Sequence, residues 1–114
     1  QKWLEIDSEL ENKIINWEGQ ESSHKTMWQK QLHLYEVPFY YIEYGMAQLG
    51  AIAMWRSYKK LGEKALDNYM NALKLGYTKS IGEIYKTAGI KFDFSIEYVK
   101  ELANFIKKEL KKLN

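Results

Sequence analysis

The chain has 114 residues, which fits one domain or a part of a larger one. Apolar residues make up 46% and charged residues 28%, so a disordered chain is excluded. The absence of cysteine excludes disulfides, thiolate metal sites and a cysteine nucleophile, and with two histidines a zinc site would also need carboxylates. A net charge of +2 gives no reason to expect nucleic acid or a membrane as a partner.

No apolar run approaches the roughly 20 residues of a membrane span, and no signal peptide opens the chain. Together with the absence of cysteine, this favours a cytoplasmic protein. The first residue is Gln1, so we expect an excised segment of a longer protein.

In the first third of the chain, Ser8 and Glu11 have the spacing of a capping box and predict a helix that ends at Gly19. Apolar residues over 27–35 predict a second helix. The single proline, Pro38, should end or kink that helix, because proline lacks a backbone donor.

Residues 39–60 are apolar around much of a helix circumference, which predicts a long, well-buried central helix. A further helix is expected over 63–75. Ser80 should begin a short helix through a capping box, and Ser95 should cap the last helix. The pattern predicts an all-α fold of five or six helices.

Lysines crowd the end of the last helix, where the helix dipole favours cations. A solvated helix face explains them, and a membrane-surface or nucleic-acid patch is the alternative. His24 lies in a polar connection, where we expect it to be exposed to solvent.

The region around Pro38 is unusually rich in rings, which are Tyr35, Phe39, Tyr40, Tyr41 and Tyr44. If a helix begins at Pro38, Tyr41 and Tyr44 project from one side, as do Tyr40 and Tyr44. Two phenol hydroxyls on one rigid element could stabilise an oxyanion without a charge of their own. His33, just before the bend, could face the same space.

Structural alternatives remain open for these residues. Helix tyrosines often lie in a core with the hydroxyl on a backbone partner, and a lone histidine is often a structural group. His33 and Glu36 could also form half of a carboxylate-bridged metal site, although no second half is recognisable in the sequence.

Three stretches carry a family resemblance: residues 28–33 (WQKQLH), 37–51 (VPFYYIEYGMAQLGA) and 88–95 (AGIKFDFS). They are similar to the C-terminal region of oligoendopeptidase F-type zinc metallopeptidases, in the same order and at similar distances. The resemblance covers residues 17–113. It implies a mostly helical, thimet-like peptidase that cleaves short peptides inside a deep channel.

In that family, a His-Glu-x-x-His helix and a downstream glutamate hold the zinc, and this sequence lacks the motif. The resemblance therefore implies that residues 1–114 are a single helical segment, the C-terminal part of a longer catalytic domain. Zinc is expected in the full-length parent and not in this segment, which should be inactive alone. Expected partners are short peptides and the rest of the catalytic domain, with no nucleic acid and no membrane.

The resemblance also implies roles for three residues. Tyr44 matches a catalytic tyrosine that stabilises the oxyanion, and His33 a histidine that serves catalysis and hydrogen-bonds the substrate. Tyr41 matches a companion tyrosine that contacts substrate, whereas Tyr40 is expected only to pack. The competing hypothesis is a non-catalytic, all-helical interaction module that binds a partner through its aromatic surface.

Overall fold

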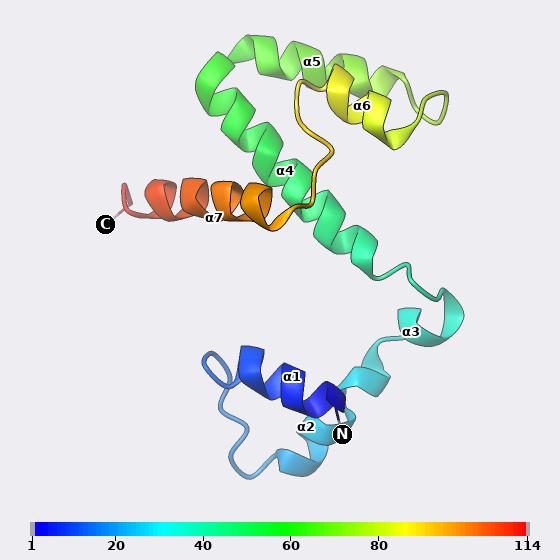
Figure 1. Ribbon diagram of the computed structural model, residues 1–114, viewed down its shortest axis with the longest axis vertical. Coiled ribbons are helices and arrows are strands. Elements are labelled where there is room, and N and C mark those ends of the chain that lie inside the picture. Colours follow the sequence, from blue (N-terminus) through cyan, green and yellow to red (C-terminus); the bar gives the residue numbers. More distant parts are fainter. Residues whose placement is uncertain (1, 114) are drawn as a thin grey trace. The chain divides into compact units, whose positions relative to one another are not determined.

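The computed structural model describes residues 2–113, which form helices and connections with no strand (Figure 1). The all-α prediction is confirmed. The helices of this part of the chain are α1 (Lys2–Glu11), α2 (Glu21–Thr26), the 3₁₀ helix η1 (Met27–Lys30), α3 (His33–Glu36), α4 (Ile42–Leu61), α5 (Glu63–Lys74), α6 (Ile81–Thr87) and α7 (Ile96–Leu110). They form two compact units, residues 1–41 and residues 42–114, and each unit is described by itself.

In the first unit, α1 begins and ends earlier than the sequence predicts. Ser8 lies inside the helix instead of capping it, so the predicted capping box is wrong. The helix ends at Glu11, before asparagines and β-branched residues that are poor helix formers. The Asn16 side chain accepts a hydrogen bond from the backbone N–H of Glu18 at 3.0 Å, which stabilises a turn where the prediction had a helix.

The single helix predicted over 27–35 is also wrong, because residues 21–36 form three short pieces. At the end of the first piece, the Thr26 hydroxyl donates to the carbonyls of Ser22 and Ser23 at 3.4 and 3.2 Å. A side chain that bonds the preceding turn in this way competes with continued α-helix, and the chain tightens into η1. This subdivision explains why there are more helices than predicted.

A tight turn follows α3. The backbone N–H of Tyr40 donates to the carbonyl of Val37 at 3.1 Å, with Pro38 at the second position and Phe39 at the third. Phe39 has a φ of 67°, the left-handed value that a type II turn requires at its third position. The predicted helix from residue 39 is therefore wrong at its start, and α4 begins only at Ile42.

In the second unit, α4 packs against α5 and α7, and α5 packs against α6 (Figure 1). The core of this unit consists of Ala53, Tyr98 and the fully buried Leu102. Partly buried Leu49, Ile52 and Ile90 complete it. Helix α4 contributes Leu49, Ile52 and Ala53, α7 contributes Tyr98 and Leu102, and the segment before α7 contributes Ile90. The core therefore holds α4 and α7 together.

The predicted caps of α6 and α7 are confirmed. At α6, the Ser80 hydroxyl accepts from the backbone N–H of Glu83, and the Glu83 carboxylate accepts from the backbone N–H of Ser80. The Ser80 hydroxyl also donates to the Glu83 carboxylate at 2.8 Å. This bond first, and the bond from the Ser80 backbone N–H second, hold the pKa of Glu83 below its usual value. At α7, the Ser95 hydroxyl accepts from the backbone N–H of Tyr98 at 3.3 Å.

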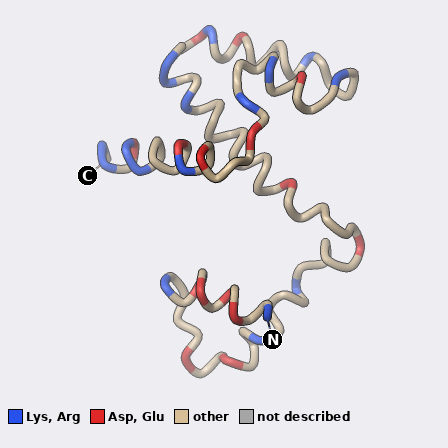
Figure 2. The backbone as a smooth tube through the Cα atoms, viewed as in Figure 1, with Lys and Arg blue, Asp and Glu red and all other residues tan. Residues whose placement is uncertain are grey.

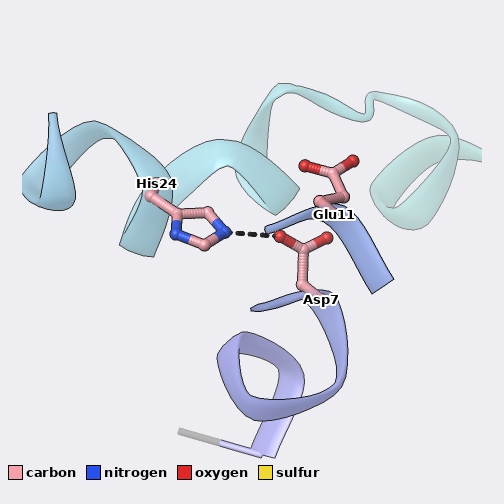
Figure 3. Close-up of side chains that lie close together, drawn as sticks. All are labelled: Asp7, Glu11 and His24. Carbon is pink, nitrogen blue, oxygen red and sulfur yellow. Dashed lines mark hydrogen bonds and ion pairs between the residues drawn. The ribbon is translucent and has the colours of Figure 1, made fainter. Parts of the chain in front are cut away.

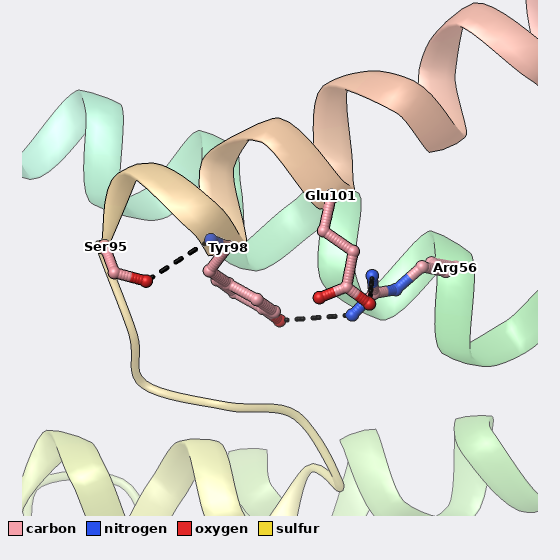
Figure 4. A network of polar contacts seen from close by, with 4 residues as sticks. All are labelled: Arg56, Ser95, Tyr98 and Glu101. Atoms are coloured by element: carbon pink, nitrogen blue, oxygen red, sulfur yellow. Dashed lines mark hydrogen bonds and ion pairs between the residues drawn. The ribbon is translucent and has the colours of Figure 1, made fainter.

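Polar contacts add to the α4–α7 packing (Figure 4). The Arg56 guanidinium of α4 donates to a Glu101 carboxylate oxygen of α7 at 2.8 Å and to the Tyr98 hydroxyl at 3.5 Å. Glu101 is largely exposed, so this ion pair contributes little energy by itself. The second bond from Arg56 satisfies the hydroxyl of the buried Tyr98, and the two bonds together fix the register of α4 against α7.

The Tyr85 side chain of α6 contacts the backbone of α4. The Tyr85 hydroxyl donates to the backbone carbonyl of Met46 at 3.3 Å. A Cβ atom added to Gly50 would lie 2.6 Å from the same hydroxyl oxygen, a distance that normal contacts do not reach. Only glycine at position 50 allows this arrangement of the phenol ring on α4.

The prediction that α4 is well buried is wrong for the part of the chain that the structure describes. Its buried residues are Gly50, Ala53 and Ser57, whereas Ile42, Trp55 and other large side chains are exposed. Basic residues gather toward the end of α4 and toward the end of α7 (Figure 2). Over residues 2–113, no helix combines the length and the apolar character that crossing a membrane requires.

The position of the core predicts that two leucines of α7 contribute very differently to the free energy of unfolding. Leu102 is 0% exposed and Leu110 is 56% exposed. We expect Leu102→Ala to lower the free energy of unfolding by roughly 2–5 kcal/mol, because it leaves a cavity in the core. Leu110→Ala is the matched control and should change it by only about 0.5 kcal/mol. Urea unfolding followed by circular dichroism measures both, and equal losses would contradict this description of the core.

Candidate active site

His33 and two tyrosines lie together in the first unit. The rings of His33 and Tyr40 are stacked, with centroids 5.9 Å apart and an interplanar angle of 5°. The rings of His33 and Tyr41 have centroids 5.6 Å apart and are tilted by 56°. The structure therefore brings together His33 and Tyr41, as the candidate site requires, and adds Tyr40, to which only packing was assigned.

Local chain geometry explains this cluster. His33 is the first residue of α3, and the turn from Val37 to Tyr40 reverses the chain directly after that helix. The reversal returns the two tyrosines to the imidazole that precedes them by about two helical turns. The turn needs a left-handed residue at position 39, where a phenylalanine gives no sequence signal of that conformation.

Tyr41 and Tyr44 are open to a ligand. Tyr41 is 46% exposed, and Tyr44, in the first turn of α4, is 53% exposed. Neither belongs to the core of the chain as the structure describes it. A phenol and an imidazole at a surface can donate hydrogen bonds to a peptide carbonyl or to an oxyanion.

One geometric argument from the sequence fails. Tyr40 and Tyr41 precede α4, so the two do not share a helix with Tyr44. Tyr41 belongs to the first unit and Tyr44 to the second. The expected approach of the Tyr41 and Tyr44 hydroxyls stays a prediction.

A second cluster joins α1 to α2 (Figure 3). Asp7 and Glu11 come from α1, and His24 comes from α2 with its Nε2 2.6 Å from an Asp7 carboxylate oxygen. His24 is only 6% exposed, so its predicted exposure to solvent is wrong. The Trp17 ring covers one face of the imidazole, with centroids 4.6 Å apart and an interplanar angle of 3°.

No pattern in the sequence indicates this second cluster, since its members are separated by a connection without periodicity. Within residues 2–113, Asp7, Glu11 and His24 are the one group of three potential metal ligands found together. His33 and Glu36 belong to no such group among these residues, so the half-site considered for them finds no support.

The two clusters border a common cleft of about 310 Å³ in the first unit. Tyr41 and Trp28 line it, and so do the acidic side chains of Asp7 and Glu11. The cleft therefore combines aromatic rings with negative charge, and a small polar ligand could reach both.

Comparison with known proteins gives one match. The family model described as Peptidase family M3 matches residues 1–104. No curated protein and no solved structure matches the chain.

The ring stacking on His33 predicts a chemical-shift effect. A nearby aromatic ring alters the chemical shifts of imidazole C–H protons, so Tyr40→Leu should move the His33 ring resonances in a ¹H–¹³C NMR spectrum. Tyr35→Leu is the matched control, because the Tyr35 ring stacks on Trp28, with centroids 6.2 Å apart. If both variants leave the His33 resonances in place, the stacked arrangement is wrong.

Proposed function

Because the chain belongs to peptidase family M3, we propose that it forms the substrate side of the active site in a zinc metallo-oligoendopeptidase. In this proposal residues 1–114 are the C-terminal part of a catalytic domain of the oligoendopeptidase F type. The family match over residues 1–104 carries the proposal, and it favours a peptidase over a non-catalytic helical module.

The residues of this chain do not fit the family's zinc site. Neither histidine is followed by glutamate and a second histidine, since Leu34 follows His33 and Lys25 follows His24. In such an enzyme, the ligands of the catalytic zinc would come from the rest of the catalytic domain. The roles proposed below therefore concern only the side chains of this chain.

Tyr44 is proposed to donate a hydrogen bond to the oxyanion that develops on the scissile carbonyl. His33 is proposed to hydrogen-bond the bound peptide or its tetrahedral intermediate, and Tyr41 to contact the substrate. The 5.6 Å separation of the His33 and Tyr41 rings supports a shared task for these two. The exposure of Tyr41 and Tyr44 supports their access to a peptide.

The large apolar side chains exposed along α4 support packing against the rest of a catalytic domain. They include Ile42 and Trp55. In the proposed parent enzyme, such packing would complete the channel that admits short peptides. A cytoplasmic location is part of the proposal, and the isolated segment is proposed to be inactive toward peptides.

Tyr44→Phe tests the oxyanion role in the full-length enzyme. Loss of one oxyanion donor typically costs roughly 2.7–4 kcal/mol, or about 10²–10³ in kcat. We expect a fall of this size in kcat with little change in KM, measured by hydrolysis of a quenched fluorescent peptide. Tyr58→Phe is the control, because it removes a hydroxyl from a half-exposed tyrosine of the same helix. Unchanged turnover in Tyr44→Phe would remove Tyr44 from the mechanism.

His33→Ala tests whether the histidine acts on substrate or holds metal. We expect kcat/KM to fall while the zinc content, measured by atomic absorption, stays at the level of the unmodified enzyme. Loss of zinc together with activity would identify His33 as a ligand, against the role proposed here.

A further inference from the structure

Asp7, Glu11 and His24 have the arrangement of a metal-ligand set. The two carboxylates are four residues apart on α1, so they lie on one face of that helix. A ligand atom from each of the three residues lies within 4.8 Å of the others. Figure 3 shows the imidazole of His24 on α2 facing the Asp7 carboxyl group, with the Glu11 side chain of α1 beside them.

The imidazole of His24 is held in a fixed orientation. Trp17 stacks on its face, and the Trp3 ring meets it edge-on with centroids 6.4 Å apart. The residue is only 6% exposed, and its Nε2 faces Asp7. A ring fixed by packing has little orientational freedom to lose on binding an ion.

Ligand chemistry selects the ion class. Imidazole nitrogen suits first-row transition ions, and two carboxylates add the negative charge that neutralises a divalent cation. With bonds of roughly 2.0–2.2 Å, ligand atoms around zinc lie about 3.4 Å apart. The 2.6 Å contact between Asp7 and His24 would widen slightly, and Glu11 would rotate inward.

An entry path and a further polar group accompany the set. Asp7 and Glu11 line the cleft shared with Tyr41, so an ion or its remaining water ligands can reach them from solvent. The Trp17 ring that stacks on His24 has a buried Nε1 with no acceptor among the described residues.

We propose that Asp7, Glu11 and His24 bind one divalent first-row transition ion, with Zn²⁺ as the probe. This proposal replaces the expectation that the segment holds no metal. It does not depend on the proposed function, because its test measures binding and not peptide hydrolysis.

The test titrates Zn²⁺ into the 114-residue chain by isothermal titration calorimetry, with the histidine ring resonances followed by NMR. We expect one Zn²⁺ per chain and a shift of the His24 resonances, with those of His33 changing less. Mg²⁺ should not compete, because it prefers octahedral oxygen ligands and several waters.

Glu11→Gln is the decisive variant. Glu11 is not the partner of His24 in the 2.6 Å contact, so this change leaves the ion pair of Asp7 and His24 intact. We expect Zn²⁺ affinity to fall by at least the roughly tenfold loss that even an outer-shell change produces. The thermal unfolding temperature without metal should stay the same. Glu9→Gln is the matched control, an exposed carboxylate of the same helix, and should bind Zn²⁺ like the unmodified chain.

Two results would overturn the proposal. Equal affinity for the unmodified chain and Glu11→Gln, or no 1:1 binding, would show that Asp7 and His24 form a structural ion pair only. A response of His33 without His24 would assign the ion to another position.

Discussion

The turn from Val37 to Tyr40 is the constraint on which the candidate site depends. Its third position requires a left-handed backbone, and a phenylalanine there costs of order 1–3 kcal/mol. The Phe39 side chain is almost fully exposed, so its burial does not offset this cost. The turn brings Tyr40 and Tyr41 back to His33. Backbone strain of this kind is typical of functional sites.

The second unit could be predicted largely from its sequence. Ser80 with Glu83 and Ser95 with Tyr98 form the expected caps, because a cap depends on residues that are neighbours in the chain. α5 ends one residue from its predicted end for a similar reason. The exposure of α4 could not be predicted, since a pattern of apolar residues says which face is suited to burial and not what covers it.

The first unit was predicted less well, because its structure depends on contacts between distant residues. The segment between α1 and α2 has no periodicity, yet it brings Trp17 onto His24 and His24 onto Asp7. Family resemblance named His33 and Tyr41 as separate substrate-side residues, and the structure places their rings in contact, with centroids 5.6 Å apart. The resemblance gave no indication that Tyr40 stacks on His33 or that His24 contacts Asp7. Both contacts depend on the path of the chain and not on a sequence motif.

The contact of the Tyr85 side chain with α4 has a consequence for the evolution of this fold. Because the Tyr85 hydroxyl lies 2.6 Å from where a methyl group would stand, a larger residue at position 50 forces the phenol at position 85 to move or to be replaced. The two positions are coupled across 35 residues of sequence. In an alignment of homologous chains, glycine at the first and tyrosine at the second should be gained and lost together.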